Sequence, residues 1–126
     1  MTLKFRGVLI ALLTTVPLLA HHSFTMFDMS KQKTLTGSVT DFQWSNPHVY
    51  IELDVPGDND AVTHWSIEMG SPSILMQSGW KFSSIKKGDK ITVIINPLKN
   101  GQQGGFLNKA TLPDGRVLGN GPGREP

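Results

Sequence analysis

The chain has 126 residues, of which 12 are Lys or Arg, 10 are Asp or Glu and none is Cys. The absence of cysteine excludes disulfides, thiolate metal sites and cysteine nucleophiles, so a bound metal would need nitrogen, oxygen or thioether ligands. The length suits one domain with a hydrophobic core.

The first twenty residues have the three-part layout of a secretory signal peptide. Lys4 and Arg6 form a basic start, residues 7–19 are an apolar run, and Ala20 is a small residue where signal peptidase would cut. The run is shorter than the ~20 apolar residues of a membrane-spanning helix, and the alternative is an uncleaved anchor helix. We therefore expect a periplasmic or secreted protein with no membrane span after processing.

Processing would also remove the apparent basic character of the chain. Loss of Lys4 and Arg6 from the 12 basic residues leaves 10, which balance the 10 acidic residues. A formally neutral chain has no basic groove to place beside its three tryptophans, which we interpret as core residues. We therefore expect no nucleic-acid partner.

After an N-terminal arm over residues 21–33, the pattern predicts a β domain over residues 34–118. Residues 34–44 are rich in β-branched and aromatic side chains and predict a long first strand. Its apolar positions change parity midway, which predicts a β-bulge near Thr40 and Asp41.

Two alternating segments follow and predict a hairpin with one buried face. Residues 48–55 alternate strictly between polar and apolar side chains, and residues 62–69 place Trp65, Ile67 and Met69 on one face. The Pro- and Gly-containing residues 56–60 between them have the composition of a turn. If the apolar sides share a core, the register pairs Asp54 with His64, Glu52 with Ser66, and Tyr50 with Glu68.

A short helix should come next, because Ser71 can cap it, Pro72 suits its first position, and Gly79 can end it in a left-handed conformation. Residues 90–96 and 105–112 predict two further strands, and residues 119–126 a disordered tail. Three strands, a helix and two strands are the element order of the OB-fold, a five-stranded barrel; the alternative is a small open β-sandwich. The predicted core is Leu35, Val39, Ile51, Leu53, Trp65, Ile67, Ile91, Val93 and Ile95.

Five short segments of the chain form a distinctive set: His21-His22-Ser23-Phe24, Leu35-Thr36-Gly37, the run from Phe42 to His48, the run from Trp65 to Pro72, and Gly79-Trp80. In these segments the chain resembles a family of small exported bacterial proteins, the domain-of-unknown-function 6152 family. The resemblance covers roughly residues 20–119, and it implies export and a compact β domain but transfers no catalytic residue.

The processed amino terminus is a candidate copper site. A chain that begins at His21 offers its α-amino nitrogen and its imidazole as a chelating pair. A third nitrogen would come from His22, His48 or His64, and Met26 or Met29 would supply thioethers for Cu(I). The alternative is a polar arm whose histidines merely follow a cleavage site.

The polar side of the hairpin is a candidate ligand face, composed of Tyr50, Glu52, Asp54, Ser66 and Glu68. OB-folds often bind ligands on this side, and the alternative is an ordinary solvated sheet face. No serine has a base and an acid at a known spacing, and no motif supports Glu52 and Glu68 as paired catalytic carboxylates. The sequence thus favours a binding protein over an enzyme, either a copper protein or a metal-free interaction module for a peptide, a glycan or an envelope protein.

Overall fold

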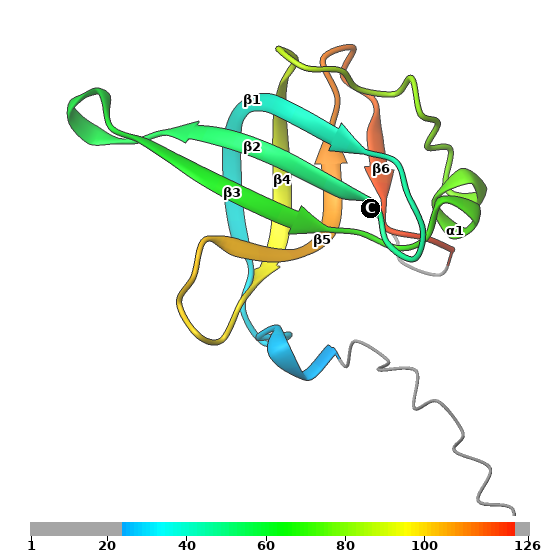
Figure 1. Cartoon of the computed structure of the whole chain (residues 1–126), viewed down its shortest axis with the longest axis horizontal. Helices are drawn as coiled ribbons and strands as arrows, with labels where there is room; N and C mark the ends of the chain where they lie inside the picture. The colour runs from blue at the N-terminus through cyan, green and yellow to red at the C-terminus, as the bar shows by residue number, and fades with distance from the viewer. Residues whose placement is uncertain (1–23, 123–126) are drawn as a thin grey trace, which may run out of the picture.

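The computed structural model of the chain describes residues 24–122 (Figure 1). The predicted signal peptide over residues 1–20, the candidate ligands His21 and His22, and residues 123–126 lie outside the described residues. The elements are η1 (Phe24–Met26), β1 (Lys33–Gln43), β2 (Tyr50–Pro56), η2 (Asp58–Asp60), β3 (Val62–Glu68), α1 (Pro72–Gln77), β4 (Lys90–Pro97), β5 (Gly104–Thr111) and β6 (Val117–Gly119).

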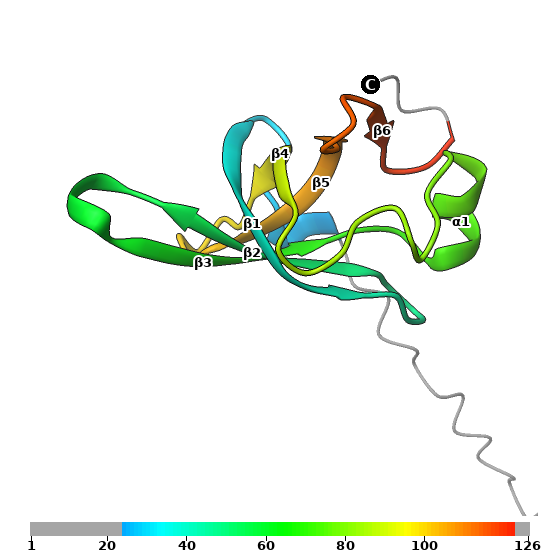
Figure 2. The same cartoon turned by 90° about the horizontal axis from the view of Figure 1, so that it is seen from above.

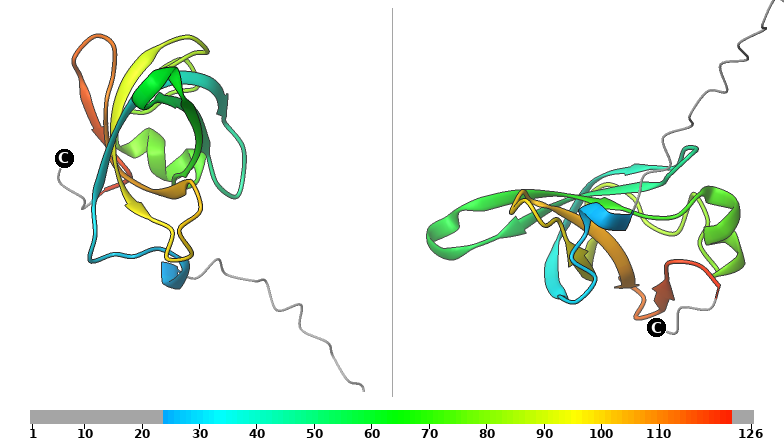
Figure 3. Two further views of the ribbon diagram at one scale, coloured as in Figure 1. Left: turned by 90° about the vertical axis from the view of Figure 1, so that its left-hand side faces the viewer. Right: turned by 90° about the horizontal axis from the view of Figure 1, so that it is seen from below.

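Strands β1 to β5 close into a barrel. β1 pairs with β2 on one side and with β4 on the other. β2 also pairs with β3, and β4 also pairs with β5. All four of these pairings are antiparallel. A parallel pairing of β3 with β5 completes the circle, which Figure 3 shows end-on in its left view. The predicted OB-like barrel, with its helix between β3 and β4, is therefore confirmed. β6, which pairs only with β5, is an additional strand that the sequence pattern did not predict.

The predicted bulge lies in the middle of β1. Val39 is paired with Leu53 and Asp41 with Glu52, so Thr40 is an extra residue on β1. Because β1 pairs with β4 through residues 33–38 and with β2 from Ser38 onward, the strand must bend sharply between its two partners. A bulge increases local twist and supplies that bend.

The core lies inside this barrel, and every core residue predicted from the alternation is buried. Ile51, Leu53 and Ile67 are fully inaccessible, which shows that the apolar side of the hairpin was assigned to the correct face. The interior also contains side chains that the prediction omitted: Val49, Met69, Leu75, Trp80, Ile85, Leu107, Ala110 and Leu112.

Helix α1 covers one end of the barrel, as the left view of Figure 3 shows. The Ser71 side chain accepts a hydrogen bond from Ile74 N, and Gly79 has a φ of 90°. The amides of Gly79 and Trp80 donate to the carbonyls of Met76 and Leu75, the two bonds of a Schellman motif. Both predicted ends of the helix are confirmed. Within residues 24–122, no helix is long and apolar enough to cross a membrane.

The described part of the arm is attached to the β4–β5 end of the barrel. Phe27 is buried and forms a β-bridge with Leu98, and the Asn96 side chain donates to the Lys31 carbonyl at 2.7 Å. The arm therefore lies against the mouth of the barrel, and β1 begins at Lys33, one residue before the predicted start.

The predicted tail begins too early at residue 119. Gly119 belongs to β6, and its carbonyl accepts a hydrogen bond from Trp80 Nε1 at 2.7 Å. Asn120 is buried, accepts a hydrogen bond from Gly70 N, and donates one to the Leu107 carbonyl, both at 2.8 Å. These contacts with distant segments make residues 119 and 120 part of the domain despite their Gly-rich surroundings.

Candidate functional site

The polar face of the β2–β3 hairpin has the predicted register. Tyr50 is opposite Glu68, Glu52 opposite Ser66, and Asp54 opposite His64. The hairpin extends beyond the barrel, as Figure 2 shows, so one end of this face lies on the projecting part and the other beside the barrel. The face therefore has two regions with different surroundings.

His64 lies between two carboxylates at the projecting end. Its Nδ1 is 2.8 Å from Asp54 Oδ1 and its Nε2 is 2.7 Å from Glu52 Oε2. The other Glu52 oxygen accepts a hydrogen bond from Ser66 Oγ at 2.8 Å. Hydrogen bonds to Asp54 and then to Glu52 raise the pKa of His64 above its ordinary value. Both ring nitrogens thus have acceptors that favour the doubly protonated imidazolium.

This arrangement predicts a pH-dependent contribution to stability. The pKa of His64 is higher in the folded state than in the unfolded state, where it is about 6.5, so protonation of the ring stabilises the fold. The whole of this stabilisation is present at pH values below the unfolded-state pKa. The contribution is lost as pH rises through the folded-state pKa. His64→Gln should therefore cost more free energy of unfolding at pH 5.5 than at pH 8.5. The effect should be small, because the His64 side chain is 55% exposed.

Urea unfolding of the wild type and the His64→Gln variant at both pH values measures this difference. An NMR titration of the His64 ring should give a midpoint above about 6.5. A midpoint at or below that value would show that the two carboxylates do not hold the ring in solution.

Glu68 and Tyr50 form the second region, beside the barrel. Glu68 is only 8% exposed, and its Oε1 lies 3.4 Å from His48 Nδ1. The same nitrogen is 2.8 Å from the Met69 carbonyl, so His48 carries a proton there and donates it. Burial raises the pKa of the Tyr50 hydroxyl, and the charge of Glu68 raises it further. Tyr50 therefore keeps its proton beside a largely buried carboxylate.

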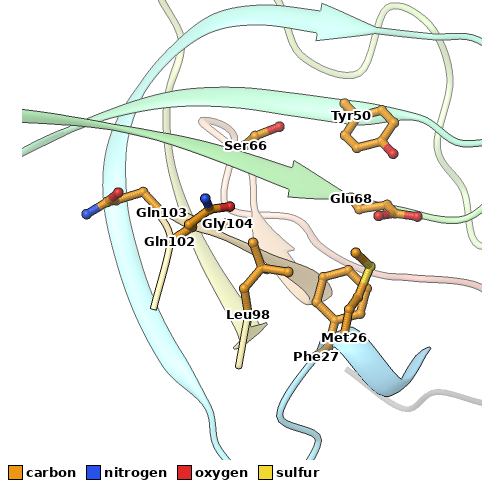
Figure 4. Close-up of a pocket in the computed structure, with 10 residues that line it drawn as sticks. Met26, Phe27, Tyr50, Ser66, Glu68, Leu98, Gln102, Gln103 and Gly104 are labelled. Carbon is orange, nitrogen blue, oxygen red and sulfur yellow. The ribbon is translucent and has the colours of Figure 1, made fainter. Parts of the chain in front are cut away.

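These two residues form one wall of a pocket of about 230 Å³. Figure 4 shows Tyr50 and Glu68 facing Met26, Phe27 and Leu98 across the opening. The remaining lining comes from Ser66 and from residues 102–105, where the β4–β5 loop leads into β5. The pocket thus joins the predicted ligand face to the arm and to a loop.

The arm and loop residues were missing from the predicted ligand face, although Met26 was named as a candidate copper ligand. The segment between the predicted strands over residues 90–96 and 105–112 was given no part in the site, although OB-folds use the loop between strands 4 and 5 together with the strand 2–3 face. That rule could have identified the β4–β5 loop. No comparable signal indicated Met26 and Phe27, because their position depends on the bridge between Phe27 and Leu98.

The structure separates the two candidate metal-ligating histidines that it describes. His48 contacts Glu68, near the end of β3. His64 lies four residues before Glu68 on the same strand, and at ~3.3 Å per residue this separates the two backbone positions by about 13 Å. A single ion would therefore not bind both. Within residues 24–122, no group of three or more His, Asp or Glu side chains is placed to hold a metal ion. The predicted terminal copper site includes His21 and His22, which lie outside the described residues.

Comparisons with known proteins show a family but no activity. A family of unknown function, DUF6152, matches residues 10–108. No curated protein matches the sequence. The mitochondrial single-stranded DNA-binding protein of S. cerevisiae has a similar structure, with 13% identity and a TM-score of 0.48 over 72% of this chain and 96% of that one.

The expectation that nucleic acid is no partner is corrected by this last finding. A single-stranded DNA-binding protein is among the structures that resemble the chain, so such a partner is no longer excluded. The exclusion relied on formal neutrality, which averages over the surface. Here carboxylates gather on β2 and β3, while three lysines lie within residues 81–87. A net charge of zero for the whole processed chain therefore does not describe the local charge of either region.

Proposed function

Because this chain belongs to DUF6152, a family of unknown function, we propose its role from the site itself. It is a small exported binding module that recognises an extended segment of another envelope protein. The segment binds at the pocket between the β2–β3 face, the β4–β5 loop and the arm. Export follows from the signal-peptide pattern of residues 1–20.

The observation that carries this proposal is the composition of the pocket. Three segments that are far apart in the sequence meet there: Met26 and Phe27 in the arm, Glu68 on β3, and residues 102–105. A pocket with apolar walls and a few converging polar groups is the usual form of a ligand site. Its position also matches the surface that OB-folds use for ligands.

The neighbouring edge of β3 favours a polypeptide as the ligand. β3 pairs with β2 along its whole length but with β5 only through residues 66–68. In the described part of the chain, the edge of residues 62–65 therefore has no second strand beside it, where the hairpin projects in Figure 1. An extended peptide can add to such an edge through main-chain hydrogen bonds while one side chain enters a nearby pocket.

Chemical-shift mapping tests this assignment. The ¹⁵N-labelled mature protein would be titrated with an equimolar pool of unstructured heptapeptides. Shifts should concentrate at Tyr50, Ser66, Glu68 and residues 102–105. Shifts confined to a surface outside the pocket, such as that around the exposed Phe82, would refute the pocket as the binding site.

A matched pair of arm variants separates occlusion from general damage. Met26 lines the pocket, whereas Met29 does not, and both side chains are about half exposed. Met26→Trp should cover the opening and weaken peptide binding, and Met29→Trp should leave it unchanged. Equal effects of the two substitutions would contradict the proposal.

Copper binding at the processed terminus remains a second candidate function. One observation favours it: Met26 and Met29 are exposed thioethers a few residues after His21 and His22. The terminal amine and an imidazole have ordinary pKa values of about 7.7 and 6.5, so both can lose protons near neutral pH and bind a metal. Copper(II) should therefore bind the processed protein, and more weakly below about pH 6.

Calorimetric or EPR titration of two preparations tests the copper proposal. A protein that starts at His21 should bind copper(II) markedly more tightly than one that keeps a methionine or a tag before it. Equal affinities would eliminate the terminal chelate and direct attention to His48 and His64. No measurable binding in either preparation would leave the peptide-binding module as the function.

A further inference from the structure

We infer that the pocket is selective for a lysine side chain of the bound segment, whose ammonium group pairs with Glu68. This inference rests on the proposed function, since it names the residue that the pocket takes from the polypeptide. It depends on the buried carboxylate, the tyrosine hydroxyl beside it and the apolar wall opposite, all shown in Figure 4.

Glu68 is a carboxylate without a strong cationic partner in a place that water barely reaches. It is 8% exposed, and the basic side chain that contacts it is the imidazole of His48, whose Nδ1 lies 3.4 Å from Glu68 Oε1. Within residues 24–122, no lysine or arginine forms an ion pair with it. A carboxylate withdrawn from water is unfavourable unless it is paired and hydrogen-bonded. A cation that enters the pocket would supply the missing partner.

Tyr50 completes the polar end of the pocket. Its hydroxyl is held protonated by burial and by Glu68, so it donates toward the carboxylate and keeps its oxygen as an acceptor. An ammonium group has three donors and can reach Glu68 and the Tyr50 oxygen together. The aromatic ring adds an attractive face for a cation.

The opposite wall suits an alkyl stem. Met26, Phe27 and Leu98 present thioether, aromatic and aliphatic surface across from Glu68. A lysine can bury its four methylenes against such a wall while its charged end reaches a polar group. A norleucine side chain would pack against the same wall but has no ammonium group to pair with Glu68.

The geometry favours lysine over arginine. A guanidinium group binds a carboxylate best as a fork that uses both oxygens. Here Glu68 Oε1 already faces His48 Nδ1. An ammonium group acts as a point charge and needs one oxygen only.

The surrounding charge also attracts a cation. The polar face of β2 and β3 carries three carboxylates, those of Glu52, Asp54 and Glu68, and the imidazole of His64. Even when His64 is protonated the carboxylates outnumber it, so the face is acidic and would steer a basic segment toward the pocket.

Peptides of the form Ala-Ala-Xaa-Ala-Ala, with blocked ends, test the selectivity by calorimetry or NMR titration. The lysine peptide should bind at least about tenfold more tightly than the norleucine, arginine and glutamate peptides. Its advantage over norleucine should shrink as salt increases. Pentylamine provides the four methylenes and the ammonium group of a lysine side chain without a peptide backbone, and it should bind more weakly than the lysine peptide.

Two substitutions of equal charge change locate the effect. Glu68→Gln should abolish the preference for lysine over norleucine. Asp54→Asn removes a carboxylate from the same face but outside the pocket, and it should retain most of that preference. Tyr50→Phe should reduce the preference while keeping the ring. Thermal unfolding of each variant confirms that it is folded before binding is compared.

The outcomes separate this inference from the proposed function. Equal binding of the lysine and norleucine peptides at the pocket would overturn the lysine claim and leave the peptide-binding module intact. Equal binding of pentylamine and the lysine peptide would support an amine site but overturn the polypeptide ligand. If Asp54→Asn abolished the preference for lysine over norleucine as completely as Glu68→Gln, the preference would come from the overall negative charge of the polar face. That result would refute a specific pairing of the ammonium group with Glu68.

Discussion

Replacing Ile67 with alanine should lower the free energy of unfolding by about 2–5 kcal/mol. Ile67 is fully inaccessible and lies on β3 opposite Ile51, where the hairpin faces the barrel interior. Truncation removes buried apolar surface and leaves a cavity that a closed barrel cannot easily collapse to fill. Urea unfolding monitored by tryptophan fluorescence measures the loss.

Val62→Ala is the matched control on the same strand. Val62 is 61% exposed, so its truncation should change the free energy of unfolding by no more than about 0.5 kcal/mol. Similar losses for the two variants would mean that β3 does not present Ile67 to the interior in solution.

Alternation in the sequence was sufficient to predict the hairpin in detail. A strand's side chains point to opposite faces in turn, so the apolar residues around Ile51 and Ile67 exclude any register shifted by one residue, and the short turn between the strands selects among the others. That register also predicts Glu68 opposite Tyr50, which is the pairing observed. The part of the site on regular strands was therefore predictable from local pattern alone.

The rest of the pocket depends on contacts between distant segments. Met26 lines it because Phe27 bridges to Leu98 and the Lys99 amide donates to the Met26 carbonyl at 3.0 Å. These residues are about seventy positions apart in the sequence, and no local period relates them. Irregular segments such as the arm have no alternation to read, so their positions appear only in the folded chain.

β6 was missed for a similar reason. The residues around it are rich in Gly and Pro, a composition typical of disorder. Asn120 nevertheless joins Gly70 to Leu107 through its side chain, and Trp80 binds the Gly119 carbonyl. The composition of a segment indicates only whether it would be ordered by itself. Here hydrogen bonds to distant segments of the domain fix the position of Gly119 and Asn120.

Gly37→Ala should also destabilise the domain strongly, by about 1–3 kcal/mol or more. A Cβ at position 37 would overlap the backbone carbonyl of Asp54 on β2, which passes closely over β1 where that strand turns from β4 to β2. Backbone cannot yield as the end of a flexible side chain does, so β2 itself would have to move. Denaturant unfolding measures the cost.

Gly57→Ala is the control, because its nearest neighbour would be the Ala61 carbonyl at 3.5 Å, an ordinary contact. It should be nearly neutral. Displacement of β2 in Gly37→Ala should further disturb the Asp54 to His64 contact, since Asp54 is the residue that is pushed. The His64 ring should then titrate closer to its ordinary pKa in this variant. An unshifted titration together with unchanged stability would show that β1 and β2 are not in close contact at Gly37, and that the bend of β1 does not set the geometry of the polar face.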